Sequence, residues 1–168
     1  SACSFLRNTA NNYAGALACL YSTLTLTDTS FGSAEDDTAG NTAPGYGGAL
    51  RLLNTADSSN AIRRSCTATI RGGGFYDNHA TSRGGAFYFA GMPLMIEPSG
   101  DGSPCVFRGN TTGAGTSDVA EADRGGAISI DDGSFAAEHD LGDGPILSVT
   151  GAIFENNSTE DQWGGALY

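Results

Sequence analysis

The sequence predicts an all-β fold, a right-handed parallel β-helix (solenoid) of about five coils, each with three short strands and with loop insertions between them. Two short motifs recur along the whole chain, and successive Gly pairs lie 33 to 41 residues apart, a spacing typical of solenoids. The composition agrees with this fold, because 25 of the 168 residues are Gly and only 16% are charged. The right-handed sense follows from the general preference of connections between parallel strands.

The two motifs are Phe-x-x-Asn and Gly-Gly-Ala followed by an apolar residue. In the second copy of the first motif, at Phe31, Ala34 stands in the place of the Asn. In the first copy of the second motif, Ala14 replaces the first Gly. We expect the motif residues of successive coils to stack into structural ladders. The expected ladders are Phe5, Phe31, Phe75, Phe107 and Phe154; Asn8, Asn78, Asn110 and Asn157; and Gly15, Gly48, Gly85, Gly126 and Gly165.

A segment of alternating apolar and polar residues precedes each complete Phe-to-Gly repeat, as in a half-buried strand. These segments are residues 23–27, 66–70, 94–96 and 147–149. The least interrupted repeat, from Cys66 to Phe89, has 24 residues, which is enough for three strands of about five residues and three bends. Three strands per coil are therefore predicted.

Aligning the repeats produces uniform inward columns and mixed outward ones, as burial would dictate. The column after the Gly pair is entirely apolar, whereas the next outward position shows no shared chemistry. The inward column is Leu17, Leu50, Phe87, Ile128 and Leu167, and the outward one is Ala18, Arg51, Tyr88, Ser129 and Tyr168.

The Gly and Asn residues are expected at the corners between strands. Sharp corners need positive φ, which Gly adopts without steric cost and Asn adopts better than most residues. Replacing Gly85 with Val should therefore strain its corner. Asn side chains one coil apart can also form hydrogen bonds along the stack.

The charge of the chain excludes some partners. The net charge is −11, and all eight basic residues are Arg. Because phosphate binding needs a basic face, a nucleic-acid partner is not expected. No apolar run is long enough for a transmembrane segment. There is no initiating Met and no signal-peptide pattern, so we expect residues 1–168 to form a single domain that is a fragment of a longer chain.

The four cysteines are expected to be structural, because no C-x-x-C pair supports a zinc site. Cys3 and Cys105 share a column three coils apart, roughly 14 Å at the usual strand spacing, which is beyond the reach of a disulfide. Cys19 and Cys66 form the remaining plausible disulfide.

No catalytic residue and no cofactor are predicted. Enzymes built on β-helices place carboxylates on neighbouring coils, and the outward positions after the motif Phe contain no such pair. Glu138, His139 and Asp140 form the one dense cluster of metal-ligand types, so Ca²⁺ binding by this loop stays open as an alternative to a solvated acidic loop. Asn110 and Asn156 begin N-x-Ser/Thr sequences and are candidate glycosylation sites, and Asn156 is favoured because it should point outward.

The Phe-x-x-Asn and Gly-Gly-Ala-Ile/Leu motifs resemble the repeats of the chlamydial polymorphic outer membrane proteins (Pmp) and, more loosely, the pectin-lyase-like right-handed β-helices. The resemblance spans the whole chain. It implies a surface-exposed passenger of an autotransporter that acts in adhesion.

From these observations we expect an extracellular or cell-surface β-helix with a structural or adhesive role and no catalytic activity, which could serve as a building block of a larger assembly or filament. Its expected partners are other protein subunits, or the continuation of the same chain, at the open helix ends, together with host or surface glycans. The alternative is a carbohydrate-active enzyme on the same fold, either a polysaccharide lyase or a glycoside hydrolase.

Overall fold

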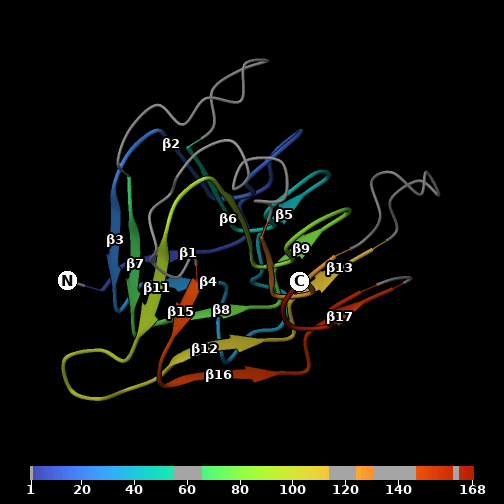
Figure 1. The fold of residues 1–168 in the computed structure, drawn as a ribbon. Helices are drawn as coiled ribbons and strands as arrows, with labels where there is room; N and C mark the ends of the chain where they lie inside the picture. Colours follow the sequence, from blue (N-terminus) through green and yellow to red (C-terminus); the bar gives the residue numbers. More distant parts are fainter. Residues whose placement is uncertain (1, 55–65, 114–123, 131–146, 161–162) are drawn as a thin grey trace.

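A computed structural model describes residues 2–54, 66–113, 124–130, 147–160 and 163–168. Within these residues every regular element is a β-strand, and the strands form four parallel sheets. Each strand pairs with the equivalent strand of the next repeat, so the sheets run along the stack and the chain passes from one to the next within each repeat (Figure 1). This arrangement is consistent with a parallel β-helix-like solenoid.

Two sheets contain the strands that lead into and include the motif Phe. The entry sheet holds the alternating segments, and the Phe sheet holds the motif Phe residues. The entry sheet consists of β3 (Leu24–Thr27), β7 (Ala68–Arg71), β11 (Leu94–Glu97) and β15 (Leu147–Val149). The Phe sheet consists of β1 (Ser4–Phe5), β4 (Ser30–Phe31), β8 (Gly74–Tyr76), β12 (Cys105–Arg108) and β16 (Ala152–Glu155).

The other two sheets follow the ladder Asn and the Gly pair. We call them the short sheet and the Gly sheet. The short sheet consists of β5 (Thr42–Ala43), β9 (His79–Ala80), β13 (Thr111–Thr112) and β17 (Ser158–Thr159). The Gly sheet consists of β2 (Leu17–Leu20), β6 (Leu50–Leu53), β10 (Phe87–Ala90) and β14 (Ile128–Ile130).

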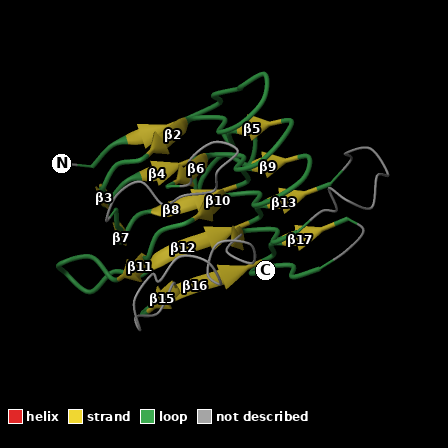
Figure 2. Ribbon diagram, turned by 45° about the horizontal axis from the view of Figure 1, so that its top comes forward, coloured by secondary structure: helices red, strands yellow, loops and turns green. Residues whose placement is uncertain are grey.

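The short sheet corrects the prediction of three strands per coil. Its strands have only two residues each, too few for the period-2 alternation that reveals a strand in sequence. The two residues nevertheless pair between repeats, as in Thr42 with His79 and His79 with Thr111. Figure 2 shows the four strands stacked along one side of the molecule.

The core lies inside the four sheets and consists of the expected columns. Leu50 and Ile128 flank Phe87 in the register of the Gly sheet, and all three are fully buried. The motif Phe rings stack nearly parallel, with centroids 4.7–4.9 Å apart, which matches the spacing of adjacent strands. Phe87 lies tilted against two rings of this stack, so the Gly sheet packs directly on the Phe sheet.

Candidate functional site

The Asn ladder is a continuous column of hydrogen bonds inside the stack. The side-chain amide nitrogen of Asn78 donates to the carbonyl oxygen of Phe31 (3.0 Å) and to Oδ1 of Asn110 (2.9 Å). Its own Oδ1 accepts from the backbone N–H (2.9 Å) and from the side-chain amide (2.8 Å) of Asn41. Both donors and both lone pairs of the buried amide are thus used, as a buried polar group requires.

The second repeat does carry its ladder Asn, contrary to the prediction that Ala34 occupies that place. Asn41 accepts from Asn8 and donates to the carbonyl oxygen of Phe5 and to Asn78. The insertion in this repeat lies between Phe31 and the Asn, and Asn41 comes seven residues later than the Phe-x-x-Asn spacing predicts. The triplet Asn-Thr-Ala at 8–10 recurs at 41–43 and at 54–56, and only the copy at 41–43 lies between Phe31 and the following Gly pair, which could have identified Asn41.

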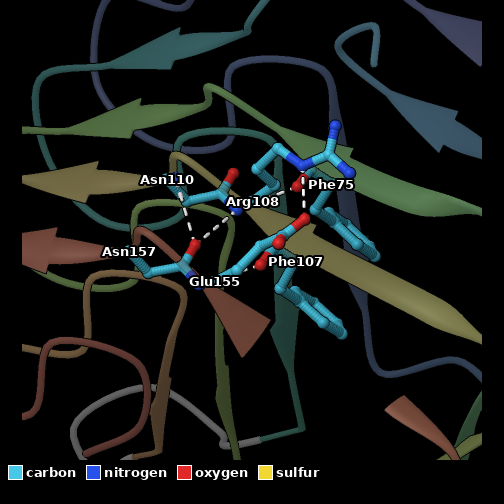
Figure 3. Close-up of polar contacts among 6 residues, drawn as sticks. All are labelled: Phe75, Phe107, Arg108, Asn110, Glu155 and Asn157. Carbon is cyan, nitrogen blue, oxygen red and sulfur yellow. Dashed lines mark hydrogen bonds and ion pairs between the residues drawn. The ribbon is translucent and has the colours of Figure 1, made fainter. Parts of the chain in front are cut away.

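The Asn ladder continues to Asn157 in the last repeat, and an ion pair lies on the surface nearby. The side-chain amide of Asn157 donates to the carbonyl oxygen of Phe107, and its Oδ1 accepts from Asn110 (Figure 3). Arg108, at the end of β12, and Glu155, at the end of β16, form an exposed ion pair on the outer face of the Phe sheet. The inner face of the Phe sheet is therefore structural, and its outer face carries paired charges.

The ladder glycines avoid a steric clash and do not adopt positive φ. A Cβ at Gly85 would lie 2.1 Å from the carbonyl oxygen of Gly126, and the other interior members show the same approach. Positive φ instead occurs at the first residue of each pair, for example at Gly84 (φ 65°) and, despite its Cβ, at Ala14 (φ 57°). Positive φ at the other corner falls on the residue before the ladder Asn, such as Asp77 (φ 54°) and Asn156 (φ 55°). The expectation that Gly85 and the ladder Asn need positive φ was wrong.

All four cysteines are thiols in the structure. Burial raises the pKa of Cys19, and the nearby Cys66 raises it further, which places the two side chains within electrostatic reach of each other. Cys3 and Cys105 occupy the same column, as expected, with Cys3 exposed and Cys105 buried. The Cys19–Cys66 disulfide stays a prediction.

The two candidate glycosylation sites differ in accessibility. Asn110 is fully buried and its amide nitrogen donates to both Phe75 and Asn157. Asn156 is exposed and precedes the ladder position. Since a glycan replaces a hydrogen of the amide nitrogen, the folded chain can accept one at Asn156 and not at Asn110 without breaking the ladder.

One outer corner brings together carboxylates from two repeats. The pKa of Asp77 is raised by partial burial and by the negative charge of Asp37, while Arg108 opposes this shift. Asp36, next to Asp37, forms an ion pair with Arg7. The alignment of motif positions could not find the proximity of Asp37 and Asp77, because Asp37 lies in the insertion of the second repeat.

Aromatic and Arg side chains form two adjacent columns beside the Gly corner. The first column contains the residue immediately before each Gly pair, and parallel bridges align its members from Tyr46 to Trp163. The second contains the outward positions of the Gly sheet, and we name the aromatic and Arg residues of both columns the Tyr–Arg stripe. The first column is Tyr13, Tyr46, Arg83, Arg124 and Trp163, and the stripe residues of the second are Arg51, Tyr88 and Tyr168.

Within the stripe, each Arg lies over an aromatic ring. The distances from the guanidinium carbon to the ring centroid are 4.1–5.2 Å, within cation–π range. Neighbouring rings lie 5.0–6.1 Å apart. The outward positions of the Gly sheet alone show no shared chemistry, and the pattern emerges only when the residue before each Gly pair is placed beside them. The Arg–ring pairs are Arg51–Tyr13, Arg83–Tyr46 and Arg124–Tyr168, and the ring pairs are Tyr13–Tyr46, Tyr46–Tyr88 and Trp163–Tyr168.

The inward columns lose their cover at both ends of the stack. Val149 and Leu167 in the last repeat are each 39% exposed, although their columns are fully buried in the middle repeats. In the first repeat Phe5 and Leu17 are only half-buried. The edge strands of every sheet also lie at these ends, for example β1 and β16 of the Phe sheet.

The candidate Ca²⁺ loop and the absence of a transmembrane segment can be compared with the described residues only in part. Glu138, His139 and Asp140 lie outside the described residues, and among the described residues no group of three potential ligands is close enough to hold a metal ion. No helix in the described part of the chain could cross a membrane.

Comparisons of the chain with protein-family models, with curated proteins and with solved structures found no significant match.

Proposed function

We propose that the chain is a right-handed parallel β-helix of about five coils that acts as a non-catalytic structural or adhesive module of an extracellular or cell-surface protein. Its two ends bind further coils, either from other subunits or from the continuation of the same chain. The observation that carries this proposal is the exposure of the inward apolar columns at both ends of the stack, where edge strands present unpaired backbone groups.

The ends are suited to this partner because the ladders can extend without a new type of contact. Asn8 and Asn157 terminate the hydrogen-bonded column, and Phe5 and Phe154 terminate the ring stack. Another coil in register would offer the same amide, ring and strand partners that each interior repeat receives. Burial of apolar area and completion of strand pairing both favour such an addition.

The resemblance of the repeats to those of the chlamydial Pmp family supports the cell-surface and adhesive parts of the proposal. The motifs Phe75-x-x-Asn78 and Gly84-Gly85-Ala86-Phe87 build the interior of the stack and leave the outer surface free to vary. A role in binding or assembly needs only such a rigid scaffold. Loops and outward columns then supply recognition.

Sedimentation velocity and electron microscopy of the purified chain test the proposal. We expect assemblies that extend along the coil axis and grow with protein concentration. Val149→Glu and Leu167→Glu place charges on the exposed end and should shift assembly to at least tenfold higher concentration. Met95→Glu is the matched control, because Met95 is similarly exposed (37%) but lies in an interior repeat.

The proposal is overturned if the wild-type chain stays monomeric at all concentrations and images of the native protein show both ends facing solvent. Equal effects of the Met95→Glu and Leu167→Glu variants would also contradict it, since a general charge effect would then explain the result.

The carbohydrate-active enzyme is the second candidate, favoured by the proximity of Asp77 and Asp37. Burial and a second carboxyl group raise the pKa of Asp77, and glycoside hydrolysis uses a pair of carboxyl groups of which one has a raised pKa. Reducing-end assays on polysaccharides test it. Turnover that Asp77→Asn abolishes and Asp101→Asn leaves intact would support the enzyme over the binding module.

A further inference from the structure

We propose that the Tyr–Arg stripe is a binding surface for an anionic polysaccharide, with the Arg residues pairing the acidic groups and the exposed rings packing against the sugar faces. The inference rests on the adhesive part of the proposed function and assigns it a site and a ligand class. It does not depend on association through the ends.

The exposed aromatic rings lie at the two ends of the stripe. Tyr13 is 39% exposed at one end, and Trp163 (61%) and Tyr168 (37%) are exposed at the other. Large exposed aromatic side chains are costly on a monomer surface and are enriched where a ligand covers them. Each end therefore presents a platform on which the apolar face of a sugar ring can pack.

Each of these platforms carries a guanidinium group. Arg51 lies 4.1 Å above the ring of Tyr13, and Arg124 lies 4.8 Å from the ring of Tyr168. Stacking on a ring fixes the plane of a guanidinium while leaving its N–H groups able to bind a planar carboxylate or a sulfate in bidentate fashion. The Nε atoms of Arg51 and Arg124 are buried and have no hydrogen-bond partner, so no protein group orients these side chains at that atom.

The charge of the stripe contrasts with that of the rest of the chain. Elsewhere in the described residues, Arg7, Arg71 and Arg108 each form an ion pair with a carboxylate. No carboxylate of the described residues forms an ion pair with Arg51 or Arg124. On a chain with a net charge of −11, a ligand with repeated negative charges is attracted only where such Arg residues cluster.

The geometry of the stripe fits an extended polymer better than a compact ion. Its first column places one side chain per repeat along the stack, from Tyr46 through Arg83 and Arg124 to Trp163. The repeats are spaced by about 4.8 Å, the distance between adjacent strands, which is comparable to the length of one sugar residue in an extended chain. A polysaccharide lying along the stack can thus meet a ring or a guanidinium at each successive residue.

Binding measurements with three polysaccharides test the proposal: polygalacturonate (carboxylated), heparin (sulfated) and dextran (neutral). Titration calorimetry at low ionic strength should detect one or both anionic polymers and no dextran, and affinity should fall as salt is added. Arg51→Gln and Arg124→Gln should each weaken binding about two- to fivefold, and the double variant about tenfold. Arg71→Gln, which removes the same charge from an exposed ion pair on the entry sheet, is the matched control and should bind like the wild type.

Absence of binding to both anionic polymers overturns the inference, as does an Arg71→Gln variant that loses as much affinity as Arg51→Gln. Preference for single-stranded DNA over either polysaccharide overturns it as well. If the Arg51→Gln/Arg124→Gln variant loses glycan binding but still assembles end to end, the loss is due to the Tyr–Arg stripe and not to failed assembly. Conversely, glycan binding by a chain that never assembles would overturn the end-association proposal and leave the stripe intact.

Discussion

The interior repeats and the terminal repeats contain the same motifs in very different surroundings. In the interior, Phe75 and Asn78 are fully buried, and the Asn amide uses every donor and acceptor. In the first repeat the side chains of Phe5 and Asn8 are half-buried, and each has a ladder neighbour on one side. The residue type of a ladder position is thus set by its place in the repeat, whereas its burial and hydrogen bonding are set by its neighbours.

This difference means that the stability of the stack is concentrated in the contacts between repeats. Each added neighbour buries one more ring and completes one more amide, and an isolated repeat could do neither. Substitutions at equivalent positions should therefore cost more in the interior than at the ends. Four pairs of measurements compare interior with terminal positions, beginning with the largest effect.

The largest effect is expected for thiol reactivity in the column shared by Cys3 and Cys105. Burial raises the pKa of Cys105 to about 12 from 9.0, which reduces its thiolate fraction at pH 8 by about a thousandfold. Cys3 occupies the same column in the first repeat and is exposed. Timed alkylation followed by peptide mass analysis should label Cys3 in minutes and Cys105 only on global unfolding. Comparable labelling rates in the folded chain would refute the interior placement of Cys105.

The next largest effect is expected at the Gly ladder. In Gly85→Ala the new Cβ meets the carbonyl oxygen of Gly126 at 2.1 Å, so the backbone of two repeats must move. We expect a loss of about 3 kcal/mol or more in the free energy of unfolding. In Gly165→Ala the nearest atom is the carbonyl oxygen of Asn157 at 3.2 Å, and the loss should be below about 1 kcal/mol. Urea denaturation of both variants measures the difference. Equal losses would show that contact with the next repeat does not determine the cost of a Cβ at these positions.

The Asn ladder should show a smaller contrast. Asn78→Ala removes the acceptor of two Asn41 donors and one donor each from Oδ1 of Asn110 and the carbonyl oxygen of Phe31, and we expect a loss of about 2–3 kcal/mol. Asn8→Ala removes one side-chain hydrogen bond to Asn41 at the end of the stack and should cost about 1 kcal/mol. The comparison again uses denaturation midpoints at constant denaturant slope. If Asn8→Ala proves as costly as Asn78→Ala, the number of hydrogen bonds made by the ladder amide does not determine its contribution to stability.

The sequence predicted the columns well because burial imposes one residue type on every repeat. The Phe column and the column of Phe87 and Ile128 were identified in the correct register. Insertions, by contrast, change the spacing between the positions that recur in every repeat. The insertion after Phe31 therefore concealed Asn41 and the approach of Asp37 to Asp77.

The Tyr–Arg stripe was not predicted for a different reason. Most of its contacts join residues of two different columns, so the outward residues of the Gly sheet, such as Arg51, looked unrelated to one another. The short sheet was not predicted because two-residue strands carry no periodic signal. Sequence alone thus indicates positions that repeat along the stack and misses contacts that cross between columns.

The smallest effect is expected at the corner before the ladder Asn, where Asp77 stands in the interior and Asn156 in the last repeat. Both have positive φ, which Asn adopts more readily than Asp, so Asp77→Asn removes a charge without losing the favoured backbone conformation. Partial burial and Asp37 raise the pKa of Asp77, so the folded state holds its proton more tightly than the unfolded state does. The resulting contribution of Asp77 to the free energy of unfolding is complete below the pKa of the unfolded state and is lost as pH rises through the pKa of the folded state.

Asp77→Asn should therefore match the wild type at pH 3 and become more stable than it at pH 7, by less than about 1 kcal/mol because solvent screens the partly exposed group. The reverse change, Asn156→Asp, places a carboxylate at an exposed corner and should be close to neutral at both pH values. Thermal unfolding of the two variants at pH 3 and pH 7 makes the comparison. A stabilisation by Asp77→Asn that is equal at both pH values would assign the effect to the backbone and exclude the charge as its cause.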